Sequence, residues 1–162
     1  ALETGSKSRA DSVYVVDSYG SFYPEQIKAL TKRYIRLAGN GRKVGIHAHN
    51  NQQLAFANTI EAMRCGAALL DVTVNGMGRG AGNCGSEQLL GYIGSSEKYN
   101  ELPVIESIVN HVLLLKQAGI IWGYDIPFLL TGQGCKHPSK ALAFVENHRT
   151  EYAGLFRQML GA

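Results

Sequence analysis

The hydrophobic positions of the chain fall into short apolar runs that alternate with longer amphipathic stretches. Three runs are expected to be strands, and they cover residues 13–16, 43–49 and 69–74. The first run is apolar throughout and rich in β-branched residues, which is typical of a strand buried on both faces of a parallel sheet. The second run ends in a pair of histidines. The third is followed by a long glycine-rich loop.

Apolar residues recur at helical spacing between and after these runs. A helix is expected to begin at Pro24, where the missing N–H of proline costs nothing, and to end at Gly39. Further helices are expected over about 51–64 and 87–93, the second capped by Ser86, and then from Pro103 to Gly119. One side of that last helix is expected to be buried, namely Ile105, Ile108, Val109, Val112 and Leu115. The segment 122–162 is expected to be mostly helical after a loop rich in proline and glycine.

The alternation of strand and helix predicts an α/β fold with a parallel sheet. Residues 1–12 are expected to form a polar leader that need not be native throughout. Residues 13–95 hold three βα units, and 96–162 form a helical segment. A sheet of three parallel strands has two open edges, which invite pairing with another element. The chain is therefore expected to be part of a larger α/β architecture.

Composition narrows the class of protein. The 162 residues are 45% apolar and 18% charged, which fits a globular chain with one core. The net charge of +3 is mild, and no basic run is interleaved with aromatics, so no nucleic-acid partner is expected. No apolar run reaches membrane-spanning length and no signal-peptide pattern opens the chain, so no membrane role is expected. Three cysteines without Cys-x-x-Cys spacing favour a reducing compartment and a cytoplasmic location.

The two histidines are the most informative pair of residues. Strand side chains alternate between faces, so His47 and His49 are expected to point the same way. Asn50 and Asn51 favour a turn directly afterwards, which places both imidazoles at the carboxyl end of a strand. Ligands of α/β proteins bind at that end, and two neutral imidazoles are suited to a divalent metal. The alternative is a surface or packing pair without a ligand.

The glycine-rich loop over 75–85 allows more than one interpretation. Its residues 80–85 match the pattern G-x-G-x-x-G of dinucleotide sites. About five residues separate the strand from the first of these glycines, and the region about twenty residues later is helical, so a Rossmann site is disfavoured. The backbone could still cradle an anion ahead of the next helix. Alternatively, the glycines only provide the geometry of a tight βα loop.

Three motifs together resemble a known family. They are, in chain order, Asp17-Ser18-Tyr19-Gly20 with Pro24, then His47-Ala48-His49-Asn50-Asn51, then Gly76-Met77-Gly78-Arg79-Gly80-Ala81-Gly82-Asn83 with Glu87. They are similar to the superfamily of metal-dependent pyruvate aldolases and acyl-CoA lyases, also called DRE-TIM metallolyases, and most similar to its 4-hydroxy-2-oxovalerate aldolase-like members. The segment from Trp122 to Pro127, with His137-Pro138 later, also resembles the tail of those members.

The resemblance implies a (β/α)8 TIM barrel, of which this chain would be the C-terminal portion, about three βα units followed by helices. The first five units would lie outside the chain, together with the family's Asp-Arg-Glu motif on the first strand. That motif supplies a metal-binding aspartate and an arginine that polarises the substrate carbonyl. The implied partners are therefore the missing N-terminal barrel half and a small 2-oxo acid substrate. The fragment alone is expected to be inactive and to form a homo-oligomer, which covers the open edges.

The resemblance also implies roles for individual residues, carried over position by position. The implied metal ligands, for Mn²⁺ or Mg²⁺, are His47, His49 and Asn83. The implied catalytic residues are Asp17 and Arg79. The implied substrate-binding residues are Asn50 and Gly82.

Two departures from the family pattern favour the aldolase branch. The acyl-CoA lyase branch has a reactive cysteine before the Gly-Asn pair, whereas Cys84 follows it here. The synthase branch has an acidic residue where this chain has Arg79. Because nothing nearby would depress the pKa of Cys84, it is interpreted as a small loop residue and not as a nucleophile.

The implied reaction is retro-aldol cleavage of a 4-hydroxy-2-oxo acid to pyruvate and an aldehyde. The catalytic base is not identified. His111 falls in mid-helix, and His137 is a better candidate than His148 because it precedes Pro138 in a loop. Two alternatives stay open, namely an acyl-CoA lyase or condensing enzyme of the same superfamily, and a non-catalytic half-barrel that binds metal or oligomerises.

Overall fold

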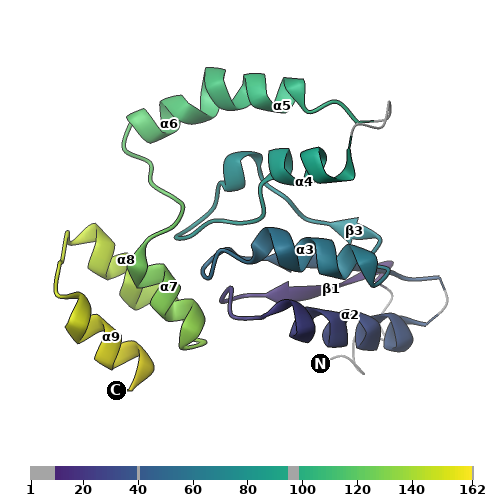
Figure 1. Cartoon of the computed structure of the whole chain (residues 1–162), viewed down its shortest axis with the longest axis horizontal. Coiled ribbons are helices and arrows are strands. Elements are labelled where there is room, and N and C mark those ends of the chain that lie inside the picture. The colour runs from purple at the N-terminus through teal and green to yellow at the C-terminus, as the bar shows by residue number, and fades with distance from the viewer. Residues whose placement is uncertain (1–9, 40, 95–98, 162) are drawn as a thin grey trace.

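A computed structural model of the chain describes residues 10–39, 41–94 and 99–161. Its sheet has three strands, β1 (Ser12–Asp17), β2 (Lys43–Ala48) and β3 (Leu69–Leu70), in the order β1-β2-β3. Both neighbouring pairs run parallel, as the alternation of strand and helix predicts. The βα units lie at one side of the molecule and the tail helices at the other (Figure 1).

Strand β3 is shorter than the predicted 69–74. Asp71 still donates its N–H to Ile46 on β2, at 3.0 Å. Two residues later the Thr73 N–H donates to the Cys84 carbonyl instead, at 2.9 Å. The chain therefore leaves the sheet because its backbone pairs with its own glycine-rich loop.

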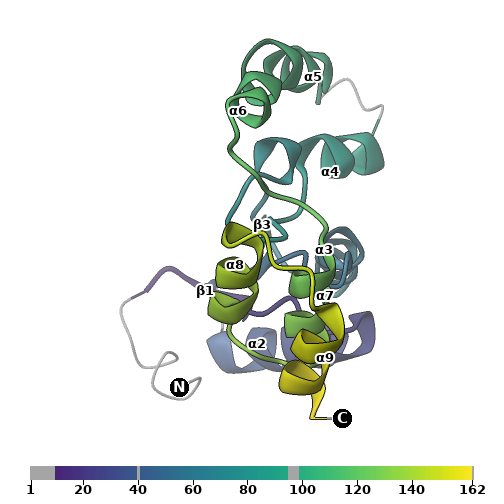
Figure 2. The same cartoon turned by 90° about the vertical axis from the view of Figure 1, so that its left-hand side faces the viewer.

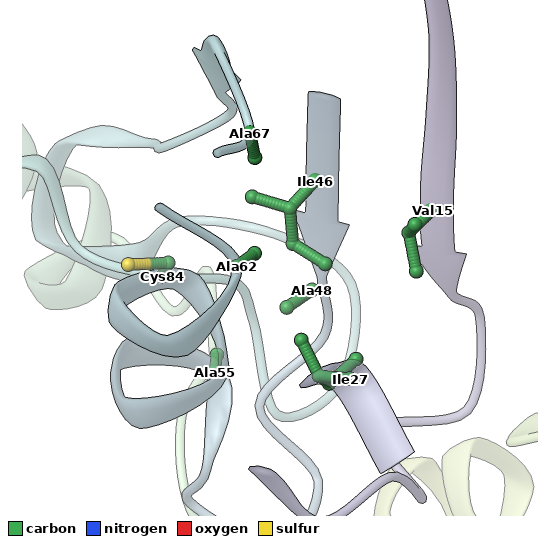
Figure 3. Close-up of a cluster of buried hydrophobic side chains, with 8 residues drawn as sticks. All are labelled: Val15, Ile27, Ile46, Ala48, Ala55, Ala62, Ala67 and Cys84. Atoms are coloured by element: carbon green, nitrogen blue, oxygen red, sulfur yellow. The ribbon is translucent and has the colours of Figure 1, made fainter. Parts of the chain in front are cut away.

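Helices α2 (Pro24–Ala38) and α3 (Ala55–Arg64) pack on one face of the sheet. Figure 3 shows the core on this face, in which Ile27 of α2 and four alanines lie around Ile46 of β2. Small side chains let a helix approach the sheet closely and leave few voids. The opposite face, which carries the side chains of Tyr14, Val16 and His47, is called the open face below, and Val16 on it is 46% exposed.

Two predicted helix starts are shifted in the structure. Helix α3 begins at Ala55 and not near 51, because Gln53 has a φ of +60° and Asn50 Oδ1 accepts the Ala55 N–H at 3.1 Å. Helix α4 (Ser86–Ile93) has Gly85 as its N-cap, so Ser86 is the first helical residue and not the cap. Asn50 thus binds the N–H of the first helical residue from the preceding turn, whereas the N-cap residue itself is Leu54.

The predicted burial of the next helix is wrong for most of its side chains. The helix consists of α5 (Leu102–Ser107), a π-helical stretch η2 (Ile108–Val112) and α6 (Leu113–Gln117). Val112 is buried, but Val109 is 56% and Ile105 is 41% exposed. Figures 1 and 2 show why, since this segment lies at one end of the molecule beyond α4. It packs on α4 and on the 3-10 turn η1 (Val74–Gly76), and its remaining apolar side is uncovered in the described part of the chain.

The tail is helical, as predicted, with α7 (Ile126–Gln133), α8 (Ser139–Glu146) and α9 (Tyr152–Leu160). Its own small core consists of Leu130, Phe144, Leu155 and Met159. Buried Asn51 ties this tail to the βα units, because its Nδ2 donates to Thr131 Oγ1 at 2.9 Å and to the Phe128 carbonyl at 3.3 Å. Among the described helices, none has the length and apolar character needed to cross a membrane.

Candidate metal centre

His47 and His49 lie side by side on the open face. Their ring centroids are 5.0 Å apart and the ring planes meet at 82°. Ala48 between them is 1% exposed and packs into the core on the other face. The alternation of strand side chains therefore places both imidazoles on one face at the end of β2, as predicted.

The oxygen atoms beside the two rings indicate which nitrogen of each ring is free. His49 Nδ1 lies 2.9 Å from the backbone carbonyl oxygen of Asp17, which can only accept a hydrogen bond. His47 Nδ1 lies 3.3 Å from Oδ2 of Asp71. Acceptors at both Nδ1 atoms favour the tautomers with the proton on Nδ1. Each Nε2 then keeps its lone pair, which is the form in which an imidazole binds a metal.

Asn83 supplies an oxygen at the same place. It forms a β-bridge with His49, and its Nδ2 donates to the Met77 carbonyl at 3.0 Å. That bond fixes the orientation of the amide. Its Oδ1 is buried and has no hydrogen-bond partner among the described residues. A buried amide oxygen without a partner requires an explanation, and a cation would supply the missing partner.

The donors present fit a divalent cation but do not complete its shell. Two imidazole nitrogens and one amide oxygen suit several divalent metals, whereas Mn²⁺ and Mg²⁺ take about six ligands, mostly oxygens. In residues 10–39, 41–94 and 99–161 there is no cluster of three or more His, Cys, Asp or Glu side chains that could hold a metal. The remaining ligands would therefore come from water, substrate or another part of the protein.

A cavity of about 330 Å³ adjoins two of these donors, His47 and Asn83. Its walls come from β2, the end of β3 and the glycine-rich loop, and its lining residues are His47, Leu70, Asp71, Val72, Thr73 and Asn83. The volume lies at the lower end of the range for small-molecule sites. The carboxyl ends of two parallel strands thus meet at one cavity, where parallel α/β proteins bind ligands.

The glycine-rich loop folds back on itself to position Asn83. Gly82 has a φ of +78°, and any Cβ there would overlap the carbonyl oxygen of Gly76. The Asn83 N–H donates to that same carbonyl at 3.0 Å, and the Gly82 carbonyl accepts the Asn50 N–H at 2.9 Å. Here glycine provides the geometry of a tight loop. The G-x-G-x-x-G match does not follow directly from a strand, because β3 ends at Leu70.

The lining of the cavity includes His47 and Asn83 but none of the other predicted site residues, which are Asp17, Arg79, His49, Asn50 and Gly82. Asp17 is 2% exposed, and its two carboxylate oxygens accept the N–H groups of Ser21 and Phe22 at 2.9 and 3.1 Å. Its side chain therefore shapes the loop after β1. Arg79 is exposed on the glycine-rich loop and does not line the cavity. The catalytic roles of both residues stay predictions, as do the substrate-binding roles of Asn50 and Gly82.

Asp71 is a site residue that the sequence did not single out. It follows β3, lines the cavity and contacts His47. The signal available in the sequence was an acidic residue inside an apolar run, Leu69-Leu70-Asp71-Val72. Such a residue is rarely placed on a strand without a polar partner.

Cys84 is a core residue, and its chemistry can be tested directly. It is 1% exposed. Burial raises the pKa of its thiol, and this effect exceeds that of Thr59, whose hydrogen bond lowers the pKa. At a given pH less thiolate is then present, and the thiolate is the reactive form. We expect alkylation of Cys84 at pH 8 to be slower than that of exposed Cys135 by on the order of 100-fold. Mass spectrometry of peptides after timed labelling measures both rates. Equal rates in the native chain, with urea-unfolded chain as the reference, would contradict this.

The fold and the site define a class, a parallel α/β protein with a prospective metal centre at the carboxyl ends of its strands. A family model described as HMGL-like matches residues 2–112 of the chain. That is more than half of its 162 residues. The chain therefore belongs to the HMGL-like family, which confirms the resemblance inferred from the three motifs.

Curated relatives align with only part of their own length. A 4-hydroxy-2-oxovalerate aldolase of Moorella thermoacetica is 34% identical over 125 residues, which are 71% of this chain and 36% of that protein. An oxaloacetate decarboxylase of Mycobacterium tuberculosis is 48% identical over 80 residues, which are 48% of this chain and 23% of that protein. The chain thus spans about a quarter to a third of the relatives it matches.

Solved structures agree with the fold. The N-terminal domain of a protein described as an aldolase, from Bacteroides vulgatus, matches with a TM-score of 0.68 at 31% identity, over 84% of this chain and 45% of that one. The carboxyl transferase domain of Rhizobium etli pyruvate carboxylase matches with a TM-score of 0.70 over 97% of this chain and 26% of that one. At 17% identity the second match concerns the fold alone. The predicted fold class, a portion of an α/β barrel, is confirmed.

Proposed function

We propose that this chain carries the metal-binding part of a lyase that cleaves a 4-hydroxy-2-oxo acid to pyruvate and an aldehyde. The observation that carries the proposal is the donor set at the ends of the strands. His47 and His49 each keep Nε2 free, and Asn83 presents a buried oxygen without a partner. The relatives named 4-hydroxy-2-oxovalerate aldolase support the choice of reaction.

The chemistry assigns distinct tasks to the metal and to the chain. A divalent cation, when bound, would act as a Lewis acid on the keto and carboxylate oxygens of a 2-oxo acid. His47, His49 and Asn83 would hold it at the cavity mouth. As the bond between carbons 3 and 4 of the substrate breaks, a base takes the proton of the 4-hydroxyl and the aldehyde leaves. The electron pair of the broken bond stays on carbon 3, which takes up a proton to give pyruvate. Oxygen ligands from water or from outside this chain would complete the shell, and Mn²⁺ or Mg²⁺ is the metal that such a shell favours.

The described residues do not identify the base that takes the proton of the 4-hydroxyl. His137 lies in the loop before α8, and its ring meets that of Tyr19 edge-on at 6.3 Å. Tyr19 belongs to the loop after β1, so His137 lies near the carboxyl end of that strand. All three histidines, His111, His137 and His148, are exposed, so this position beside the loop after β1 is what favours His137. Among these three, His137 stays the candidate, as the sequence suggested.

A second candidate reaction is the decarboxylation of a 2-oxo acid such as oxaloacetate. The relative named oxaloacetate decarboxylase, at 48% identity over the aligned residues, favours it. The two reactions share their chemistry, because each breaks a carbon–carbon bond and leaves the electron pair on pyruvate. An acyl-CoA lyase is less well supported, since Cys84 is buried in the core and unavailable as that branch's reactive thiol.

The complete protein is proposed to include the missing barrel half, which would cover the open face. Val16 on that face and Val109 on η2 are apolar side chains left exposed here. A homo-oligomer would cover the same surfaces, and a non-catalytic metal-binding module is the remaining alternative. The homo-oligomer and the cytoplasmic location both stay predictions.

Pyruvate release distinguishes these candidates. The protein that contains this chain and the rest of the barrel is incubated with Mn²⁺, and pyruvate is measured through lactate dehydrogenase. We expect release from 4-hydroxy-2-oxovalerate that stops with a chelator and returns with added Mn²⁺. Release from oxaloacetate alone would select the decarboxylase, and a requirement for an acyl-CoA would select that branch. No release from any substrate would leave only the non-catalytic module.

A further inference from the structure

The open face carries a row of polar contacts that crosses all three strands. In the register of the sheet, Tyr14 on β1 pairs with Gly45 on β2, and Gly45 pairs with Leu69 on β3. His47 lies two residues beyond Gly45 on β2. Asp71 lies two residues beyond Leu69, directly after β3, where its N–H still donates to Ile46, so both side chains share the face of Gly45 and Leu69. His47 Nδ1 and Asp71 Oδ2 are 3.3 Å apart.

Tyr14 reaches this pair because residue 45 has no side chain. The aromatic ring of Tyr14 lies across Gly45, where any Cβ would overlap the ring carbons. Its hydroxyl thereby comes near Asp71, which follows the next strand but one, and the interaction with that carboxylate raises the pKa of Tyr14. Without a glycine at residue 45, the ring of Tyr14 could not cross β2 to approach Asp71.

The donors and acceptors in this row can be assigned. An ionised carboxylate only accepts, so the Tyr14 hydroxyl donates to Asp71 and the protonated Nδ1 of His47 does the same. Burial raises the pKa of Tyr14, and the nearby charge of Asp71 raises it further, so the phenol stays a neutral donor. Asp71 is itself 45% exposed. The contact with Tyr14 therefore restricts where the carboxylate of Asp71 can lie.

We propose that Tyr14 and Asp71 are positioning residues that hold His47 with its proton on Nδ1 and its Nε2 toward the cavity. The inference rests on the proposed metal function, because a free Nε2 matters only to a ligand. His49 reaches the same state by another route, through the backbone carbonyl of Asp17. The two imidazoles thus depend on different acceptors, one a side chain and one the main chain.

The tautomer of each ring can be measured without metal. Long-range ¹H–¹⁵N spectra of metal-free chain at about pH 8.5, where ordinary imidazoles are neutral, identify the protonated ring nitrogen. We expect Nδ1–H for both His47 and His49 in the unaltered chain. In Asp71→Ala, His47 should change to mostly Nε2–H, the form that free imidazole side chains prefer in water. His49 should keep Nδ1–H, so it serves as the control within the same molecule.

A gentler variant keeps the test decisive if Asp71→Ala perturbs the fold. Tyr14→Phe removes only one hydroxyl, and we expect a partial change of the His47 tautomer in the same direction. The backbone ¹H–¹⁵N spectrum of each variant shows whether the sheet is intact. If His47 keeps Nδ1–H in both variants with the sheet intact, or if His49 changes equally, the proposal is wrong.

Metal binding supplies the second measurement. Loss of an outer partner of a ligating histidine lowers metal affinity by about 10- to 100-fold. We expect Mn²⁺ affinity, measured by calorimetry, to fall by that factor in Asp71→Ala and by less in Tyr14→Phe. A tautomer change in chains that bind no Mn²⁺ at all would support the positioning role and overturn the proposed metal function. The two claims can therefore fail separately.

Discussion

Replacing His47 and His49 together with alanine is expected to abolish the binding of Mn²⁺. The two imidazoles are two of the three proposed protein donors, of which His47 and Asn83 line the cavity and His49 lies beside His47, and Asn83 alone would leave a single amide oxygen. Both rings are partly exposed on the open face and contribute little to the core between β2 and α3. The fold should therefore survive the change. Calorimetry with Mn²⁺ measures the loss, and circular dichroism monitors the fold.

A matched control removes two histidines that lie elsewhere. His111 and His148 are exposed, on η2 and after α8, and neither lines the cavity. Their double replacement by alanine should leave Mn²⁺ affinity unchanged. Affinity in the unaltered chain is expected to be weak, because part of the ligand shell lies outside it, so millimolar protein and metal are appropriate. Undiminished binding in the His47 and His49 variant would refute the assignment.

Gly82→Ala is expected to disrupt the loop that presents Asn83. Two effects combine at this position, a φ of +78° that disfavours a side chain and an overlap of the new Cβ with the Gly76 carbonyl oxygen. The strained conformation alone costs about 1–3 kcal/mol, and relief of the overlap must move the acceptor of the Asn83 N–H. We expect the free energy of unfolding to fall by at least that amount in urea titrations. Mn²⁺ affinity should fall as well.

Gly119→Ala separates the two effects. Gly119 also has a positive φ, +88°, but a Cβ there meets nothing within 4 Å. It should therefore show only the conformational cost, with no change in Mn²⁺ affinity. If both variants lose the same stability and keep the same affinity, the loop does not position Asn83 as described here.

The three strands and their parallel pairing could be predicted from sequence, because buried β-rich runs such as 13–16 and 43–49 carry a strong local signal and helices separate them. The end of β3 at Leu70 could not be predicted in this way. Residues 71–74 keep the composition of a strand, and they leave the sheet only because Thr73 pairs with Cys84 within the loop. The apolar side of the predicted helix after Pro103 was misassigned for a related reason, since periodicity identifies an apolar face without showing what covers it.

Some features of the candidate site could likewise be predicted from sequence and others could not. The shared face of His47 and His49 follows from strand geometry and was predictable from a spacing of two. The contact of His47 with Asp71 depends on the register of β2 against β3, which one sequence does not reveal. The unpartnered Oδ1 of Asn83 depends on a loop with several glycines at positive φ, whose path no propensity scale predicts.

We propose that one divalent cation binds at His47, His49 and Asn83. Paramagnetic broadening by Mn²⁺ tests it most directly, because the effect falls steeply with distance from the ion and is visible even when binding is weak. In ¹H–¹⁵N spectra of the chain at substoichiometric Mn²⁺, the account predicts that signals of these three residues and of Asp71 vanish first. Signals of α9 should persist. Broadening centred elsewhere, or uniform over the chain, would contradict the account.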